Sequence, residues 1–439
     1  MPVRRLPCLP WFSLPVTLLA IGIGCASAPL VVAPLPAPPP PAPIVIAPVR
    51  VSPVRALVEG SLASVGMDST LSGRLDSIAQ VAIAEGAAPG AALVVGRFGR
   101  LVYQRGFGTL DYAAGSPAAS TATLYDLASL TKVVATTTAA MILEEEGKLD
   151  LARTIRSYLP ELDATDKASI TVRMLLTHSG GLESYAPLYL KHRGRADFIS
   201  QINLRPLRSV PGTTTVYSDW DMVLLQAVIE RITGMPLDQF AAHRVFEPLG
   251  MFDTQFLPDT ANASLRIRIA PTAVDTSRGG LLQGTVHDGN AWALGGVSGH
   301  AGLFSSARDL AVFAQTLLAG GTYGDAHLVT PTTVARWTSR QGAVSSRALG
   351  WDTPAPESSA GRFFSPRSFG HTGFTGTSLW VDPERGLFVV LLMNRVNSHG
   401  TSTRHLKFRR DVADAVQAGI VDAPLTDWEA RREGTRVAP

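Results

Sequence analysis

"LYDLASLTKVVATTTAAMILEEEGK", residues 124–148, predicts a helix over about 130–146 with Gly147 as its stop. Ser129 and Lys132 are three residues apart, so their side chains share one face of the first turn. A lysine there faces the positive end of the helix dipole, where an acidic residue would be favoured. The pair therefore marks the start of this helix as a candidate site of chemistry.

Strands are predicted at both ends of the folded part of the chain. Residues 90–108 predict two strands joined by a turn at Gly99-Arg100, and residues 377–394 predict a second hairpin. A helix over about 406–417 follows this hairpin. Strands at both ends with helices between them predict an α/β (α+β) fold, in which helices flank one antiparallel sheet. A mainly helical lobe is inserted over about 130–295, and a cleft between the two parts is a natural ligand site.

Further helices are indicated by apolar spacing and by start and stop residues. The segment 69–85 has amphipathic spacing, and 218–234 begins with polar capping residues and ends at a glycine. The segment 305–321 repeats that order, with Ser306 and Asp309 spaced as a capping box. The segment 218–234 therefore predicts a helix within the inserted lobe, and the other two predict helices before and after it.

The first 24 residues predict a secretory signal peptide, with Arg4 and Arg5 before a short apolar run. "AIGIGC", which ends at Cys25, resembles the lipobox of bacterial lipoproteins, whereas "ASA" at 26–28 fits ordinary signal cleavage. We favour lipidation at Cys25 and keep ordinary cleavage as the alternative. Either reading predicts export to the periplasm or cell envelope, with a lipid anchor to the membrane in the first case.

A proline-rich tether is predicted over residues 25–54. Its near-uncharged core, 29–53, is too rich in proline for helix or sheet and should extend as polyproline II. At about 3.1 Å per residue it would reach up to roughly 75 Å. A disordered leader without a spacing role is the alternative. The tether would be followed by a hydrolase domain over 55–425 and a tail over 426–439.

Composition limits the functions that remain open. The chain has 439 residues, 46% of them hydrophobic, which is enough for a large core. Without Arg4 and Arg5, 37 of the 39 basic residues face 36 acidic ones, and no basic run predicts nucleic-acid binding. Both cysteines lie at or before residue 25, so the folded part is predicted to use neither disulfides nor thiol chemistry.

Three short motifs carry a family resemblance. Ser129-Leu130-Thr131-Lys132 has the S-x-x-K form of penicillin-recognising serine enzymes. Tyr217-Ser218-Asp219 falls where class C β-lactamases have Tyr-Ser-Asn, and His371-Thr372-Gly373 falls where they have Lys-Thr-Gly. The stretches 147–162, 170–182 and 301–313 are also similar to that family. In this order the motifs resemble the class C β-lactamase and penicillin-binding-protein superfamily over about residues 70–420.

The resemblance implies a serine hydrolase that works through an acyl-enzyme. Ser129 would be the nucleophile, and Lys132 would form the general-base system with Tyr217. A lysine can act as this base if burial and neighbouring charge depress its pKa. The backbone N–H groups of Ser129 and Phe374 would bind the oxyanion. His371, Thr372 and Gly373 would form the substrate-binding wall. No metal and no organic cofactor is implied.

Several of these residues also have structural interpretations. Ser129 could be an N-cap and Lys132 a solvated first-turn residue, although the other motifs argue against this. Asp219 either contacts the substrate or caps the helix that follows it, and as an acceptor it cannot repeat the donor role of asparagine. His178 is interpreted as a turn-stabilising residue. His287, Asp288 and His300 match no common zinc spacing, so the segment that carries them is interpreted as a glycine-rich loop near the cleft.

Several substrate classes are compatible with the resemblance. We expect a D,D-carboxypeptidase or peptidase acting on D-alanyl peptides, because His-Thr-Gly also occurs among D,D-peptidases of the family. A carboxylesterase or weak class C-type β-lactamase with the same residues is the first alternative. A non-catalytic envelope protein that binds muropeptides is the second. The partner in each case is a small molecule or peptide: a D-alanyl peptide, a β-lactam or an ester.

Overall fold

The computed structural model describes residues 56–162, 165–342, 345–356, 358–397 and 402–428. The predicted signal peptide, Cys25 and the proline-rich tether lie outside these residues, as does most of the predicted tail. Among the helices that the structure describes, none has both the length and the apolar character needed to cross a bilayer.

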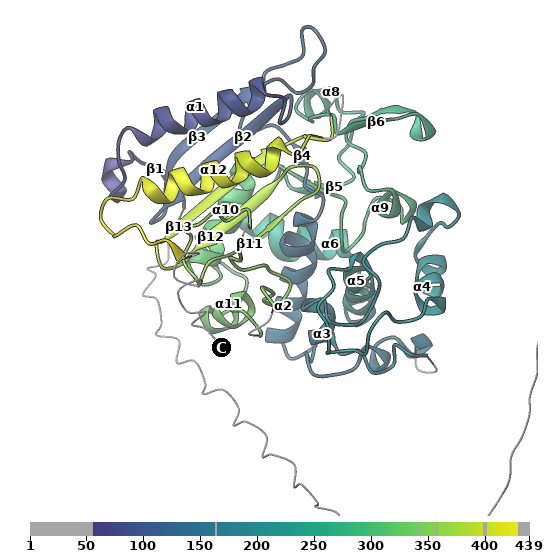
Figure 1. Cartoon of the computed structure of the whole chain (residues 1–439). Coiled ribbons are helices and arrows are strands. Elements are labelled where there is room, and N and C mark those ends of the chain that lie inside the picture. Colours follow the sequence, from purple (N-terminus) through teal and green to yellow (C-terminus); the bar gives the residue numbers. More distant parts are fainter. Residues whose placement is uncertain (1–55, 163–164, 343–344, 357, 398–401, 429–439) are drawn as a thin grey trace, which may run out of the picture. The chain divides into compact units, whose positions relative to one another are not determined.

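A six-stranded sheet joins the two ends of the described chain (Figure 1). Its strand order is β1-β3-β2-β13-β12-β11, and every neighbouring pair is antiparallel except β1 with β3. The C-terminal strand β13 pairs with β2 from Leu387↔Arg97 to Met393↔Ala91, which confirms that the C-terminus completes the sheet. The strands are β1 (Val58–Glu59), β2 (Gly90–Arg97), β3 (Arg100–Gly108), β11 (Phe369–Thr372), β12 (Ser378–Asp382) and β13 (Leu387–Met393).

The central strands are covered on both faces, so every residue of β2 and β13 is buried. Alternate side chains of a strand point to opposite faces. Leu93 and Val95 therefore pack with the helices α1 (Leu71–Ala84) and α12 (Arg404–Ala418), while Val94 packs with α10 (Ala307–Leu318) and the helical region. This layering confirms the predicted sheet between helices (Figure 1).

Helix ends follow the predicted signals, with one difference. α5 (Asp219–Thr233) begins at Ser218, whose hydroxyl accepts the N–H of Trp220, and it ends at a left-handed Gly234. At α10 the Ser306 hydroxyl accepts the N–H of Asp309. The predicted capping box is nevertheless wrong, because the Asp309 carboxylate accepts hydrogen bonds from the 253–254 segment and not from the cap.

The region predicted to be helical is mostly so, but it also contains short strands. Its helices are α2 (Thr138–Glu145), α3 (Val172–Leu176), α4 (Arg195–Leu204), α5, α6 (Leu237–Ala241), α7 (Glu247–Leu249), α8 (Ala263–Arg266) and α9 (Gly289–Ala293). A hairpin of β6 (Ala273–Asp275) and β7 (Gly280–Leu282) lies within it. A small sheet, β4-β8-β5, joins β4 (Tyr125–Asp126), β8 (Leu303–Ser305) and β5 (Gln255–Phe256). β9 (Thr322–Tyr323), β10 (Ala326–His327) and α11 (Pro331–Thr338) follow α10.

Candidate active site

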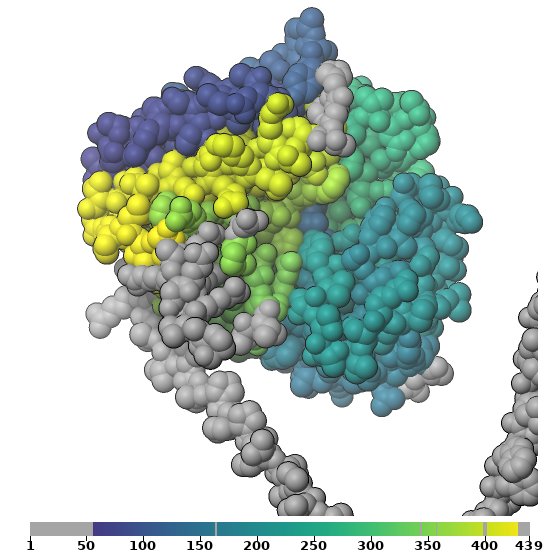
Figure 2. Space-filling model, viewed as in Figure 1, coloured from purple at the N-terminus to yellow at the C-terminus, as the bar shows by residue number. Residues whose placement is uncertain are grey.

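A cleft of about 990 Å³ lies where β11, the edge strand of the large sheet, faces the helical region. Figure 2 shows the C-terminal strands and the teal helical region meeting along this side of the molecule. Among its lining residues are Ser129, Tyr185, Tyr189, Tyr217, Asp219, Asp288, His300, Arg347, His371, Thr372, Gly373, Phe374, Arg395 and Arg409. The structure therefore gathers the three sequence motifs, which are far apart in the chain, around one opening.

Ser129 lies in the turn between β4 and the predicted helix. The turn is held by Asp126, which accepts the N–H of Ala128 (2.8 Å) and that of His287 (2.7 Å). Burial raises the pKa of Asp126 to about 6. Ala128 has a left-handed backbone (φ 46°), a strained conformation of the kind that collects at functional sites.

The helix that follows Ser129 is not a regular α-helix at its start. Residues Lys132–Thr137 (η2) form a π-helical segment that continues into α2, and Gly147, with φ 70°, ends the run as predicted. π-helical turns are rare and occur often at functional sites. The strained turn and the irregular helix thus place Ser129 in the lining of the cleft, with the buried Lys132 hydrogen-bonded to it.

Lys132 is fully buried, so it is not the solvated surface residue of the alternative interpretation. Its ammonium group donates to Ser129 Oγ (2.8 Å), to Asp219 Oδ1 (2.8 Å) and to the His300 carbonyl oxygen (3.1 Å). An ammonium group has three N–H donors, and each has an acceptor here.

The electrostatic state of Lys132 corrects one prediction. Burial by itself lowers the pKa of Lys132, but the Asp219 carboxylate and Tyr217 outweigh burial, and the pKa is raised above its ordinary value. The condition stated for a lysine base, a depressed pKa, is therefore not met in the free protein. Lys132 is therefore a charged hydrogen-bond donor in the free protein.

Asp219 does not cap the helix. Ser218 is the N-cap of α5, and Asp219, its first residue, directs its carboxylate at Lys132. The capping interpretation is therefore wrong. The aspartate has the effect of fixing a positive charge beside Ser129, which an asparagine at the same position would do less strongly.

Tyr217 lies beside the Ser129–Lys132 pair. Lys132 Nζ is 4.9 Å from the centroid of its ring, and Arg347 Cζ is 5.0 Å from the same centroid. Two cations thus flank the phenol, and both would stabilise negative charge that develops on its oxygen during proton transfer. The sequence reasoning did not find Arg347.

The loop after β11 is hydrogen-bonded to the segment that leads to Ser129. The Thr375 hydroxyl donates to the Asp126 carbonyl oxygen (2.6 Å), and the Thr377 hydroxyl donates to that of Leu127 (2.9 Å). A Cβ at Gly373 would lie 2.3 Å from the Leu127 carbonyl oxygen, so only glycine permits this approach. Phe374, the predicted second oxyanion donor, follows directly in this fastened loop.

The two backbone groups predicted to bind the oxyanion are available for it. Within the described part of the chain, the N–H groups of Ser129 and Phe374 have no hydrogen-bond acceptor. Unpaired backbone donors beside a cleft are costly to leave without a partner, and substrate oxygen is the acceptor they suit.

His371 contributes hydrogen bonding to the wall, not charge. It is buried in β11, and its Nδ1–H donates to the Thr372 carbonyl oxygen (2.9 Å). Burial, together with the nearby Arg347 and Lys132, lowers the pKa of His371 well below its ordinary value. The lysine of the class C motif is therefore replaced here by a neutral imidazole.

Positive charge on this wall comes from Arg395 and Arg409, which the sequence reasoning missed. Arg409 is buried and donates to the carbonyl oxygens of Gly373 (2.7 Å), Gly376 (3.0 Å) and Thr377 (2.8 Å), and burial lowers its pKa to about 9. Arg395 donates to the Phe374 carbonyl oxygen (2.5 Å). Neither guanidinium is paired with a carboxylate within the residues that the structure describes.

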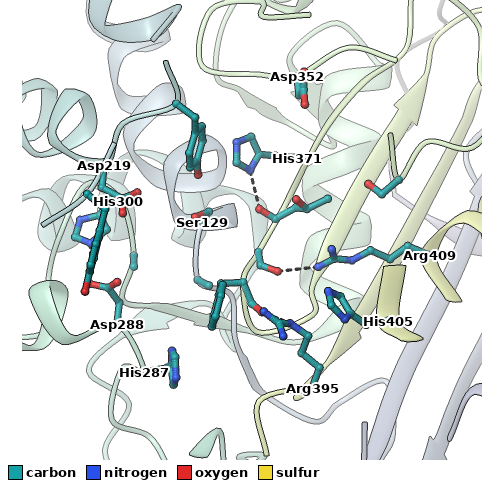
Figure 3. Close-up of a pocket in the computed structure, with 18 of the residues that line it drawn as sticks. Ser129, Asp219, His287, Asp288, His300, Asp352, His371, Arg395, His405 and Arg409 are labelled. Carbon is teal, nitrogen blue, oxygen red and sulfur yellow. Dashed lines mark hydrogen bonds and ion pairs between the residues drawn. The ribbon is translucent and has the colours of Figure 1, made fainter. Parts of the chain in front are cut away.

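Figure 3 shows the two arginines on one side of Ser129 and the acidic residues Asp219 and Asp288 on the other. The charge in the cleft is therefore unevenly distributed. The two guanidinium groups lie near the loop after β11, and the carboxylates of Asp219 and Asp288 lie near α5 and α9. A substrate anion would be attracted to the arginine side.

The residues Asp219, Asp288 and His300 also bring three metal-ligand atoms within 4.8 Å of one another. Each already has a partner, because His300 Nε2 lies 2.8 Å from Asp288 Oδ1, and Asp219 is paired with Lys132. The pKa of Asp288 is lowered, because His300 and a backbone N–H outweigh the opposing effect of burial. Asp219 and Lys132 form an ion pair. The segment that carries Asp288 and His300 lines the cleft as predicted, but it is not all loop, because Gly289–Ala293 within it forms α9.

Comparisons with known proteins identify the class to which this cleft belongs. The family model described as Beta-lactamase matches residues 75–414. The chain therefore belongs to the beta-lactamase family and is a serine hydrolase of that family.

Several relatives carry a more specific name. The chain is 35% identical over 346 residues to an Escherichia coli O157:H7 protein named "Putative D-alanyl-D-alanine carboxypeptidase", with 71% of this chain and 79% of the relative covered. It is 34% identical over 377 residues to a protein of the same name from Salmonella agona, with 78% and 87% covered.

Solved structures share the fold. A beta-lactamase/D-alanine carboxypeptidase from Pseudomonas syringae superposes with a TM-score of 0.63 at 21% identity, covering 78% of this chain and 98% of that one. EstCE1, described as a hydrolase with promiscuous acyltransferase activity, gives 0.65 at 25% identity, with 80% and 99% covered. These superpositions confirm the predicted fold class.

Proposed function

We propose that this serine hydrolase is a D,D-carboxypeptidase-type enzyme that acts on peptides ending in D-alanine. The observation that carries the proposal is that Ser129, hydrogen-bonded to Lys132, shares one cleft with Arg395, whose guanidinium has no carboxylate partner among the described residues. A carboxypeptidase substrate has a free carboxylate one residue beyond the bond to be cut. A partly buried arginine suits that carboxylate, because guanidinium groups can bind carboxylates through two hydrogen bonds.

Peptide binding has a natural place at the edge of the sheet. Asp352 already pairs with Gly370 of β11 through two backbone hydrogen bonds of 2.9 Å. The strand edge beyond Gly370, at His371 and Thr372, lines the cleft. An extended substrate can add to this edge and bring its scissile carbonyl toward Ser129.

The chemical steps follow from the geometry. Once Lys132 has lost a proton, it accepts the Ser129 hydroxyl proton directly or by way of Tyr217, and Ser129 Oγ attacks the carbonyl carbon. The N–H groups of Ser129 and Phe374 hold the oxyanion. Collapse of the intermediate expels D-alanine, whose nitrogen receives the proton, and water then releases the acyl group from Ser129.

The place of action belongs to the same proposal. The signal-like leader and the proline-rich segment support export, with Cys25 as the site of a lipid anchor, and D-alanyl peptides occur in the cell wall. Cys25→Ala should move the protein from the membrane fraction to the soluble periplasmic fraction. A variant that stays with the membrane would refute anchoring at Cys25.

The direct test measures D-alanine released from diacetyl-L-lysyl-D-alanyl-D-alanine and from the same peptide with a C-terminal amide. We expect the free acid to be preferred by about tenfold or more in kcat/KM, since a charged hydrogen bond contributes about 1.5–3 kcal/mol. Ser129→Ala should release nothing. Equal turnover of the acid and the amide would contradict recognition of the carboxylate.

A carboxylesterase, or a weak β-lactamase, is the second candidate. It is favoured by the open cleft of about 990 Å³ and by the likeness to EstCE1. Such an enzyme would turn over an aryl ester or a chromogenic cephalosporin faster than it releases D-alanine. The ratio of these rates on one preparation therefore separates the two candidates.

A further inference from the structure

His178 contacts Tyr217 and the residues on both sides of it. The His178 carbonyl oxygen accepts the N–H of Val216 (2.8 Å), and its Nδ1 accepts the N–H of Ser218 (3.3 Å). Its ring centroid is 4.7 Å from that of Tyr217. The residues before and after Tyr217, and its own ring, are therefore all held by one side chain and its backbone.

The backbone of His178 is left-handed, with φ 54°. A residue other than glycine rarely adopts this conformation, and it costs energy that the surrounding contacts must supply. Here the conformation allows both the carbonyl group and the ring of His178 to face the 216–218 segment. The strain therefore serves the placement of Tyr217.

Asp221, on the first turn of α5, holds the imidazole in place. Its Oδ2 lies 2.9 Å from His178 Nδ1, and both side chains are almost completely buried. Because the N–H of Ser218 already points at Nδ1, that nitrogen is an acceptor. The contact with Asp221 then needs a proton on the carboxyl group, with Asp221 as the donor.

The surroundings of the pair favour this neutral form over an ion pair. Asp221 Oδ1 is buried without a hydrogen-bond donor, which an ionised carboxylate would tolerate poorly. His178 Nε2, also buried without a partner, carries a proton in both forms and does not distinguish them. Burial, then Asp219, raise the pKa of Asp221 well above its ordinary value despite the opposing charge of Lys132. Burial, then Arg347, Lys132 and His371, lower the pKa of His178.

We propose that His178 and Asp221 form a neutral, hydrogen-bonded positioning pair that holds Tyr217 against Lys132. The pair is not a base, because the Nδ1 lone pair of His178 is occupied by two donors and Asp221 keeps its proton. The inference rests on acyl transfer at Ser129, part of the proposed function, but not on the identity of the substrate.

The kinetic test compares Asp221→Asn with Asp221→Leu. Asparagine keeps a donor for His178 Nδ1, so acylation by penicillin or an aryl ester should stay within about threefold of wild type. Leucine has similar volume but no donor, and acylation should fall about tenfold or more, mainly in kcat, since a misplaced acid–base group loses part of its 10²–10⁴-fold effect. An asparagine variant as impaired as the leucine variant would overturn the neutral pair.

A double-mutant cycle with Tyr217→Phe tests whether the pair acts through Tyr217. Asp221→Leu should change the residual acylation of the Tyr217→Phe protein by less than about twofold, because the two substitutions remove one function. Full additivity would mean that Asp221 acts elsewhere, for example on stability alone.

A measurement without substrate keeps the pair testable if the proposed function fails. The infrared difference spectrum of wild type minus Asp221→Asn at neutral pH should contain the carbonyl band of a protonated carboxylic acid. A carboxylate band in its place would refute the neutral pair whatever the enzyme acts on.

Discussion

The two walls of the cleft handle charge in opposite ways. On the helical wall, Lys132 is enclosed, and each of its donors has a partner inside the protein. On the sheet wall, the histidine is neutral and the guanidiniums of Arg395 and Arg409 face no carboxylate within the described residues. On the helical wall the positive charge already has its partners before a substrate binds, whereas on the sheet wall the positive charges have no carboxylate partner among the described residues.

This difference separates two tasks. A closed network with fixed donors suits proton transfer, because the groups need not reorganise during the reaction. Unpaired cations beside an opening suit recognition, since an incoming anion supplies the missing partner. Substitutions on the helical wall should therefore act on rate, and those on the sheet wall should act on the choice of substrate.

The largest effect is expected where the helical wall is broken. Lys132→Ala and Tyr217→Phe should each lower the acylation rate by about 10²–10⁴-fold, the range of a lost acid–base group. Stopped-flow acylation by a chromogenic ester measures this rate, and circular dichroism should report an unchanged fold. Lys148→Ala, which alters an exposed lysine near the other end of the same helix, is the matched control. Near-normal rates in either active-site variant would remove that residue from the base system.

A substitution on the sheet wall should change mainly KM. Arg395→Ala should raise KM for the D-alanyl peptide acid by about 10–100-fold, the cost of a lost charge-assisted hydrogen bond, and should change KM for the amide by less than about threefold. Lys407→Ala, an exposed cation on α12, should change neither value. If acid and amide are affected equally, Arg395 supports the loop and does not bind the carboxylate.

Asp219→Asn tests how the carboxylate of Asp219 controls the charge state of Lys132. Asp219 raises the pKa of Lys132, so in wild type the acylation rate should increase with pH as the ammonium group loses its proton. The variant removes that cause, and the rising limb should move to lower pH. A shift of about one unit corresponds to about tenfold more rate at a fixed pH on that limb. A rate–pH profile that does not move would show that Lys132 does not limit the rate as a base.

The smallest effect concerns stability and tests Asp221. Its folded-state pKa is raised, so the native protein holds a proton that the unfolded chain has lost above its ordinary carboxyl pKa. This group's contribution therefore becomes less favourable as pH rises from about 4 toward the raised value. Thermal melts should show that the free energy of unfolding of Asp221→Asn increases relative to that of wild type by about 1 kcal/mol or more as the pH rises over this range. A constant difference at every pH would contradict the raised pKa.

Most of the fold could be predicted because its signals are local. The end of α2 at Gly147, the limits of α5 and the hairpin of β12 and β13 each depend on neighbouring residues, and the structure confirms them. The turn between β2 and β3 is shifted by one residue, to Phe98-Gly99, both of which have positive φ. The β6–β7 hairpin was missed because Ala273–Asp275 and Gly280–Leu282 are too short to show a period.

The site could be predicted only in part. Motif order was sufficient to bring Ser129, Lys132 and Tyr217 together, but the charge state of Lys132 depends on Asp219, 87 positions further along the chain. Arg409 was missed although it lies beside Phe408 on a buried helix face, where an arginine is an unusual residue. Which carbonyl groups it holds depends on a loop that the sequence does not place.

The central claim is that Ser129 is the nucleophile of an acyl-enzyme, and labelling with a fluorescent penicillin tests it most directly. We expect wild type to carry a covalent label and Ser129→Ala, still folded by circular dichroism, to carry none. Mass spectrometry of the labelled protein should place the adduct on the peptide that contains Ser129. A label that survives the substitution, or an adduct on another residue, would contradict the account.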